Sequence, residues 1–168
     1  VVIVHGDDKG LVFPWKIAPK HVVIVPIGQN KEIMSKAEKL KESLETMDLD
    51  IEIDTSEKTP GEKFNIWEMK GVPLRIELGD KEIQNKELTI FRRDINKKEK
   101  IKEKDLPDYI KNVAKDYDSN LVIKADSLFN DKIKEADSKQ ELKNILESGK
   151  IARCGFCSVG LDGEKCAA

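Results

Sequence analysis

The sequence predicts an α/β fold: a mixed sheet of about five strands flanked by helices, followed by a second, mainly helical α/β part. Three observations predict it. A nearly continuous apolar run at residues 21–27 (HVVIVPI) is typical of a strand buried on both faces of a sheet. Residues 33–47 carry apolar side chains three and four positions apart, which indicates an amphipathic helix that Gln29 or Asn30 would cap and that would end near Met47. Residues 49–54 alternate like a second strand, so the three segments predict a crossover unit with two parallel strands.

A further helix and strand follow around a glycine–proline turn. Pro60 suits the first turn of a helix. Gly71 is expected to end this helix, because glycine readily takes the left-handed conformation at a helix C-terminus. Residues 74–78 (LRIEL) then alternate, which predicts a strand with Arg75 and Glu77 on an exposed face.

The second half of the chain contains one clearly basic stretch. The elements expected here are a short helical turn over 80–85, a strand over 87–93, a long helix over 106–135 that is either continuous or broken near 118–120, a helix capped by Ser138 that ends near Gly149, and a strand over 150–156. Residues 92–104 hold seven Lys or Arg against three Asp or Glu. Such a stretch is either a solvated loop or a surface for phosphate groups.

Composition and charge exclude several classes of protein. The net charge of −2 provides no general basic field, so a polyanion would have to bind a local patch. We find no run of about 18 apolar residues and therefore expect no membrane span. The first ten residues lack the basic and apolar regions of a signal peptide. With only three cysteines, an odd number, the sequence predicts a cytoplasmic protein without a disulfide framework.

The cysteines nevertheless form a compact motif. Cys154 and Cys157 make a CxxC pair, and Cys166 follows after eight residues. A CxxC pair suits either redox or metal chemistry. Because closed zinc sites usually need four ligands, the site is either incomplete or has ligands beyond Ala168.

A possible base-reading group lies on the helix and strand around Gly71. Arginine can bond guanine O6 and N7 together, a carboxylate can accept from the Watson–Crick edge of guanine, and an aromatic ring can stack on an unpaired base. Arg75, Glu68 and Phe64 are the corresponding side chains, and stacking contributes about 1–3 kcal/mol per base. The alternative is that Phe64 and Trp67 belong to the core and that Arg75 forms a surface ion pair with Glu68 or Glu77.

Several stretches together resemble the prolyl-tRNA synthetases of the archaeal and eukaryotic type. They are GDDKGLVFPWKIAP, HVVIVPI, KFNIWEMKGVPLRIELGDKEI and LTIFRRD, and they occur in the same order over nearly the whole chain. The KGVPLRIE core is shared loosely with the histidyl, threonyl and glycyl enzymes, whereas FNIWEMKGVPLR is more specific. The resemblance implies the end of a catalytic domain and a linker over 1–19, a class II anticodon-binding domain over 20–98, and a truncated C-terminal domain over 99–168.

The resemblance also implies roles for individual residues. Phe64 would stack on an anticodon base, and Glu68 and Arg75 would read the two guanines that proline anticodons share. Lys81 and Glu82 would make further base or backbone contacts. Candidates for contact with the phosphate backbone in the basic stretch are Arg92, Arg93, Lys97, Lys98 and Lys100.

The implied function is that of a proline–tRNA ligase, which charges tRNA with proline using ATP. This chain would supply anticodon recognition without any catalytic residue. The catalytic domain, with its ATP and magnesium sites and most of a homodimer interface, would precede Val1. The linker departs from the family at Phe13–Trp15 (FPW), where Leu-Pro-Pro is usual, and so lacks a rigid proline.

Cys157 and Cys166 resemble the first half of a zinc site in the family's C-terminal domain, and we expect this half site to be empty. Cys154 then has no ligand role. Two readings from other classes remain open: a stand-alone RNA-binding or regulatory module that reuses the domain, and a small cysteine-based redox or metal protein. The expected partner is tRNA with a proline anticodon, with neither DNA nor a membrane.

Overall fold

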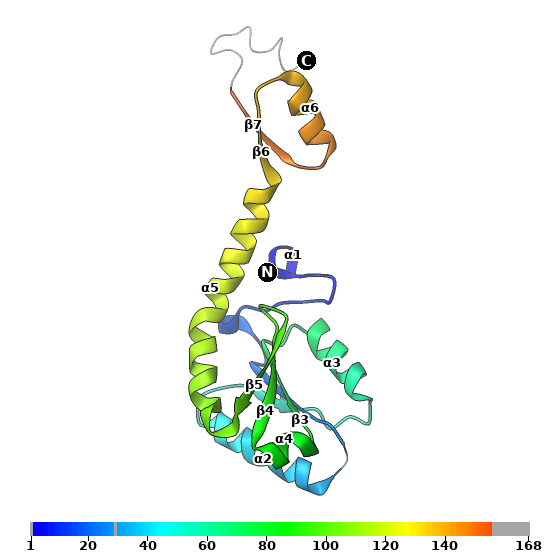
Figure 1. The fold of residues 1–168 in the computed structure, drawn as a ribbon, viewed down its shortest axis with the longest axis vertical. Helices are drawn as coiled ribbons and strands as arrows, with labels where there is room; N and C mark the ends of the chain where they lie inside the picture. Colours follow the sequence, from blue (N-terminus) through cyan, green and yellow to red (C-terminus); the bar gives the residue numbers. More distant parts are fainter. Residues whose placement is uncertain (1, 29, 156–168) are drawn as a thin grey trace. The chain divides into compact units, whose positions relative to one another are not determined.

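The computed structural model describes residues 2–28 and 30–155, and the chain forms two compact units, Val1–Ile123 and Lys124–Ala168 (Figure 1). In chain order the elements are α1 (Val2–His5), a 3-10 turn η1 (Trp15–Ile17), β1 (Val22–Pro26), α2 (Lys31–Glu45), β2 (Ile51–Ile53), α3 (Pro60–Met69), β3 (Leu74–Leu78), α4 (Asp80–Asn85), β4 (Glu87–Arg92), β5 (Lys97–Lys102), η2 (Glu103–Asp105), α5 (Leu106–Lys132), β6 (Ile133–Ala136), α6 (Lys139–Glu147) and β7 (Ile151–Cys154).

The first unit is built on a five-stranded mixed sheet in the order β2-β1-β3-β4-β5. β1 pairs in parallel with both β2 and β3, while β3, β4 and β5 run antiparallel to their neighbours. The predicted mixed sheet and its parallel crossover pair are thus confirmed. The basic stretch is not the solvated loop that its charge pattern allowed, because Lys97–Lys102 pairs with β4 as the edge strand β5. Lysines on an edge strand discourage pairing with other chains.

Helices cover both faces of this sheet. The helical residues buried on one face are Ile33, Ala37, Leu40 and Leu44 of α2 and Leu106, Ile110, Val113, Tyr117 and Leu121 of α5. On the other face, Trp67 of α3 packs with Val23 and Val25 of β1 and with Val72. β3 is therefore buried along its whole length, and the prediction that Arg75 and Glu77 are exposed is wrong: only 3% and 5% of their surfaces are accessible.

Local sequence signals explain where the helices begin and end. The Asn30 side chain accepts a hydrogen bond from Glu32 N at the start of α2, and Thr59 and Glu62 form a capping box at the start of α3. Gly71 follows α3 with a φ of +74°, as predicted. A side chain at Gly71 would also collide with Leu11, since a Cβ added at this position would lie 2.7 Å from the Leu11 backbone. Glycine is thus required by both the conformation and the close approach of the linker.

Arg93 binds the linker to the rest of the first unit. This side chain is fully buried and pairs with the Asp7 carboxylate, and it also donates to the backbone carbonyls of Gly10 and Glu68. Its position corrects the prediction that Arg93 contacts phosphate, because a buried and fully engaged guanidinium presents no donor to solvent. The hydrogen bonds and charge of Arg93 hold the pKa of Asp7 well below its ordinary value.

Trp15 lies in the FPW segment, where the resemblance would lead one to expect Leu-Pro-Pro. Its contacts fix the C-terminal end of the linker. Its ring is 8% exposed and lies 5.2 Å from that of His21 and 6.0 Å from that of Tyr117, measured between ring centroids. Its backbone N–H donates to the Asp118 carboxylate on α5. Aromatic packing thus takes the place of a rigid proline in fixing the path of the chain.

The second unit contains β6 and β7, which pair in parallel, with α6 as the connection between them. Ser138 caps α6 as predicted, accepting from Glu141 N. β6 was not predicted, because its four residues continue directly from α5 without a breaking residue. β7 ends at Cys154, which is exposed. The predicted half site of Cys157 and Cys166 lies outside the described residues.

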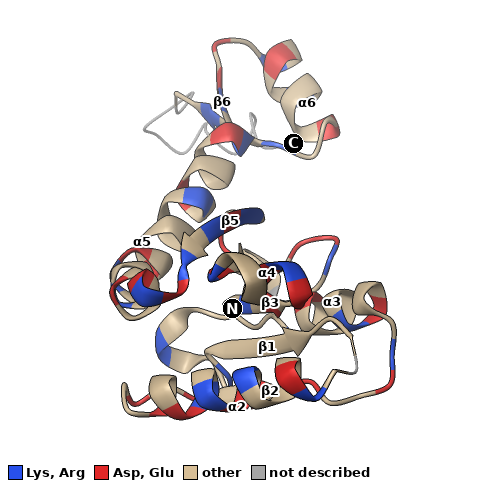
Figure 2. Ribbon diagram, turned by 60° about the horizontal axis from the view of Figure 1, so that its bottom comes forward, with Lys and Arg blue, Asp and Glu red and all other residues tan. Residues whose placement is uncertain are grey.

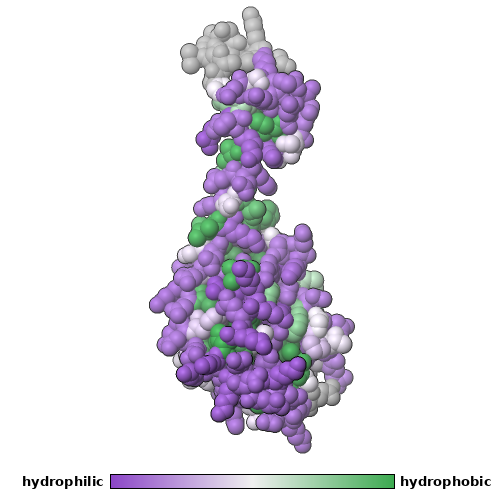
Figure 3. Space-filling model, in the orientation of Figure 1, coloured by the Kyte–Doolittle hydropathy of each residue, from purple (hydrophilic) through white to green (hydrophobic). Residues whose placement is uncertain are grey.

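One face of the molecule is strongly polar. The face in Figure 3 is mostly hydrophilic, and the hydrophobic side chains on it form small separate areas. None of the described helices combines the length and the apolar character needed to cross a membrane.

Replacing Arg93 tests how firmly the linker is held. We expect Arg93→Met to lower the free energy of unfolding of the first unit by about 3 kcal/mol at pH 7, because Asp7 loses its partner. Lys41→Met, which removes an exposed pair with Glu45, should cost under about 1 kcal/mol. Urea unfolding measures both changes.

The effect of Arg93→Met should also depend on pH. The pKa of Asp7 is lowered in the folded state, so its stabilising effect is present above the ordinary aspartate pKa of about 3.9 and is lost as pH falls through the folded value. The difference between the two proteins should therefore be constant near neutral pH and shrink below about pH 4. An equal difference at pH 7 and at the lowest pH would contradict the pairing.

Candidate nucleic-acid interface

A cavity of about 540 Å³ lies between the linker, α3, β3 and β5. Its lining residues are Asp8, Lys9, Gly61, Phe64, Asn65, Glu68, Met69, Arg75 and Lys98. It brings together three predicted base-reading residues, Phe64, Glu68 and Arg75, and adds Lys9. The sequence did not point to Lys9, because the linker approaches α3 only through tertiary contacts such as the bond from Leu11 N to Met69 O.

Arg75 is the most constrained side chain of the cavity. Its guanidinium lies between two aromatic rings, 4.1 Å from the centroid of Phe64 and 4.4 Å from that of Phe91. Nε and Nη2 donate to one oxygen of Glu77, at 3.2 and 3.0 Å. Nη1 donates to Glu68 Oε1 at 2.9 Å and to the Phe64 carbonyl at 3.3 Å. In this conformation Arg75 orients two carboxylates rather than projecting into solvent.

Glu68 supplies the carboxylate that α3 brings to the cavity. Its Oε1 is held by Arg75, while its Oε2 lies 3.4 Å from Lys9 Nζ, and its side chain is 12% exposed. Burial raises the pKa of Glu68, but the hydrogen bond and charge of Arg75 and the charge of Lys9 outweigh it, so the pKa is lowered overall. Glu68 is therefore ionised at neutral pH and acts as a hydrogen-bond acceptor.

Figure 2 shows β5 as a strand of mainly basic residues. Strand alternation divides the basic side chains between the two faces of the sheet. Lys98 lies opposite Phe91 on β4, which itself lies opposite Arg75, so Lys98 belongs to the face of the cavity. Its Nζ is 2.7 Å from a Glu77 oxygen. Lys100, two residues on, shares this face.

The other candidates in the basic stretch lie elsewhere. Lys97 is opposite Arg92, and alternation places both on the face that α5 covers. Arg92 is occupied by Asp94, at 2.7 Å, and Asn120 of α5 donates to the same carboxylate. The five predicted phosphate contacts therefore do not form one surface.

Lys81 and Glu82 lie on α4, apart from the cavity. The Glu82 carboxylate caps this short helix by accepting from Gly79 N, and it also accepts from Thr89 Oγ1. Because Thr89 is opposite Glu77 on β3, Glu82 stands at the end of the cavity's own sheet face. Lys81 is exposed.

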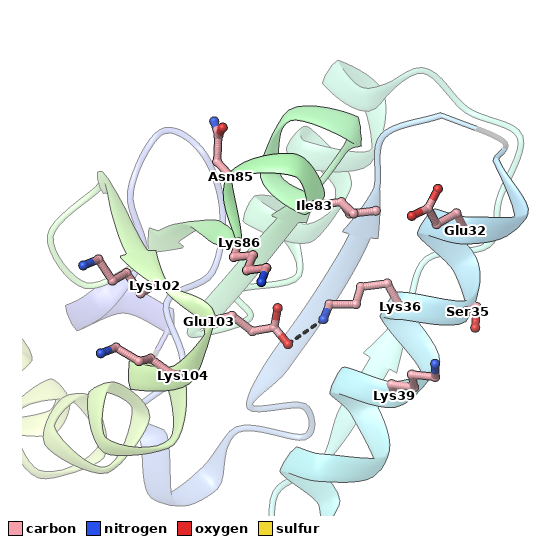
Figure 4. Close-up of a pocket in the computed structure, with 10 residues that line it drawn as sticks. All are labelled: Glu32, Ser35, Lys36, Lys39, Ile83, Asn85, Lys86, Lys102, Glu103 and Lys104. Carbon is pink, nitrogen blue, oxygen red and sulfur yellow. Dashed lines mark hydrogen bonds and ion pairs between the residues drawn. The ribbon is translucent and has the colours of Figure 1, made fainter.

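A larger cavity of about 880 Å³ lies between α2, α4 and the end of β5 (Figure 4). Its lining residues are Glu32, Ser35, Lys36, Lys39, Ile83, Asn85, Lys86, Lys102, Glu103 and Lys104. Lys36 and Glu103 form an ion pair of 2.6 Å across it. None of these described lining residues is aromatic, so the cavity offers no surface for stacking a base. The smaller cavity is therefore the better candidate for base recognition.

Within the described parts of the chain, no group of three or more His, Cys, Asp or Glu side chains is placed to hold a metal ion.

The environment of Glu68 can be tested by titration. We expect Arg75→Met to raise the pKa of Glu68 towards and above its ordinary value, because burial then acts without the opposing guanidinium. Lys9→Met, a change at an exposed side chain, should raise it by less. Carboxyl ¹³C NMR measures both shifts, and Lys41→Met is a control. A Glu68 pKa that neither Lys9→Met nor Arg75→Met changes would contradict the geometry.

Several known proteins are similar to this chain over nearly its whole length. Residues 21–113 match the model of the family described as "Anticodon binding domain". Proline–tRNA ligase of Thermofilum pendens is 37% identical, with the match covering 99% of this chain and 35% of that protein. The chloroplastic/mitochondrial proline–tRNA ligase of Arabidopsis thaliana is 38% identical, over 98% of this chain and 32% of that protein. That of Pyrococcus abyssi is 37% identical, over 98% and 36%.

This chain therefore spans about a third of the length of these curated relatives. The family model covers more than half of the chain and includes the whole five-stranded sheet, α3 and the residues of the cavity outside the linker. The chain belongs to the anticodon-binding domain family.

Proposed function

We propose that this chain recognises the anticodon of tRNA as part of a proline–tRNA ligase, an enzyme that charges tRNA with proline using ATP. One observation carries the proposal: the aromatic ring of Phe64 and the ionised carboxylate of Glu68 line the same cavity. The extended similarity to proline–tRNA ligases supports the identity of the enzyme.

Recognition would begin with an anticodon base unstacked from its loop. The base would stack on Phe64, a contact worth about 1–3 kcal/mol. Glu68 would accept hydrogen bonds from N1–H and the exocyclic amine of guanine, because an ionised carboxylate only accepts. Arg75 would hold Glu68 in place for this contact. A direct contact of Arg75 with a second guanine would require it to give up a bond to Glu68 or Glu77.

The proposed share of this chain in the enzyme is recognition alone, assigned to residues 20–98 with the docked linker. ATP, magnesium and proline would be bound by parts of a cytoplasmic, homodimeric ligase outside this chain. We also propose that Cys157 and Cys166 form half of a zinc site in the domain over residues 99–168.

Anticodon stem-loops test the proposal. The chain should bind a stem-loop with the GG anticodon at least tenfold more tightly than one in which both guanines are adenines. Glu68→Gln should reduce this preference about tenfold or more, because it removes a charge-assisted hydrogen bond. Phe64→Leu should weaken binding by a factor consistent with a lost stack of about 1–3 kcal/mol.

Phe129→Leu is the matched control, because Phe129 is an exposed phenylalanine of the second unit. It should leave both affinities unchanged. Equal binding of the two stem-loops by the unaltered chain would overturn the proposal.

Salt dependence tests the division of the basic stretch. Lys100→Gln should weaken binding of both stem-loops alike and reduce the slope of log K against log salt by about 0.7, the value for one contact with single-stranded nucleic acid. Lys97→Gln, on the opposite face of β5, should leave the slope unchanged. Fluorescence anisotropy between 50 and 200 mM salt would measure both, and equal slopes for the two variants would contradict the division.

A further inference from the structure

We propose that Lys9 of the linker is a specificity-determining residue for guanine. Lys9 would donate a hydrogen bond to O6 of the base, while Glu68 would accept hydrogen bonds from N1–H and the exocyclic amine of the same base. This inference rests on the proposed function and deepens it. It assigns half of the base-reading pair to a segment that precedes the matched domain at residues 21–113.

The geometry places a donor and an acceptor side by side in the cavity. Lys9 Nζ lies 3.4 Å from Glu68 Oε2, and both residues line the cavity with Phe64. The Lys9 side chain is 54% exposed, so its ammonium group remains available to a ligand. The other oxygen of Glu68 is held by Arg75, which fixes the carboxylate in this position.

This pair matches one base better than the others. The Watson–Crick edge of guanine presents an acceptor, O6, followed by two donors, N1–H and the amine. Lys9 supplies only donors and ionised Glu68 only acceptors, so all three groups of guanine are satisfied. Adenine and cytosine present a donor to Lys9 and an acceptor to Glu68. Uracil presents one matching acceptor and one matching donor, followed by a second acceptor that would face Glu68. The expected order of preference is guanine, then uracil, then adenine and cytosine.

A tight turn holds Lys9 at this place before any ligand binds. Asp7 and Gly10 exchange two backbone hydrogen bonds of 3.0 and 2.9 Å, and Lys9 N donates to Asp7 Oδ1 at 3.0 Å. Arg93 anchors the Asp7 end. Gly10, at a φ of +129°, packs so closely on α3 that a Cβ added to it would lie 2.5 Å from Met69 Cα. The backbone that carries Lys9 is thus fixed in advance and loses little freedom when a ligand binds, which favours specificity.

The test combines Lys9→Met with altered bases in the stem-loop. Lys9→Met keeps the aliphatic stem and removes the donor and the charge. We expect it to weaken binding of the GG stem-loop about tenfold or more, as for a lost charge-assisted hydrogen bond, and to change binding of the adenine stem-loop less than twofold. Lys16→Met, at an exposed lysine elsewhere on the linker, should change neither affinity.

Two guanine analogues separate the halves of the pair. Replacing the recognised guanine by 6-thioguanine weakens the acceptor that faces Lys9 and should lower the affinity of the unaltered chain. This loss of affinity, the 6-thioguanine penalty, should be absent in Lys9→Met. Replacing it by inosine removes the amine facing Glu68, so its penalty should persist in Lys9→Met and disappear in Glu68→Gln.

The outcomes distinguish this inference from the proposed function. If Lys9→Met weakens binding of the guanine and adenine stem-loops equally, Lys9 is a phosphate contact and the inference is overturned. A 6-thioguanine penalty that persists in Lys9→Met would also overturn the inference. In both cases a guanine preference of the unaltered chain would leave the proposed function standing. If the unaltered chain shows no preference for guanine, both the inference and the proposed function are overturned.

Discussion

The candidate site depends on how Arg75 is held. The guanidinium lies between the rings of Phe64 and Phe91 and bonds carboxylates from two elements, Glu68 on α3 and Glu77 on β3. A buried arginine is stable only when such partners compensate for its loss of water. In satisfying that requirement, the fold also fixes the position and ionisation of Glu68, the group proposed to meet the base.

A second buried arginine joins the linker to this site. Arg93 binds Asp7 on one side and the Glu68 carbonyl at the end of α3 on the other. The turn that presents Lys9 and the helix that presents Glu68 are therefore fixed by the same side chain. The linker is therefore part of the candidate interface.

Much of the fold follows from sequence pattern because its signals are local. The buried strand at 21–27, the caps at Asn30 and Ser138 and the glycine after α3 were predictable from periodicity, hydrogen-bonding groups and backbone conformation. β6 escaped prediction because it carries no such signal.

The environment of the site was less predictable, because it depends on contacts between residues far apart in the chain. Alternation placed Arg75 on the correct face of β3 but could not reveal that α3 and Phe91 cover it. Nor could the sequence indicate that Lys9 lies beside Glu68.

The most direct test of base recognition is an NMR titration with a GG anticodon stem-loop, following the Phe64 ring and the Glu68 carboxyl. Large shifts of both, with the Lys36 signals of the larger cavity unchanged, are the predicted result; unchanged Phe64 and Glu68 signals with shifts around Lys36 would contradict it.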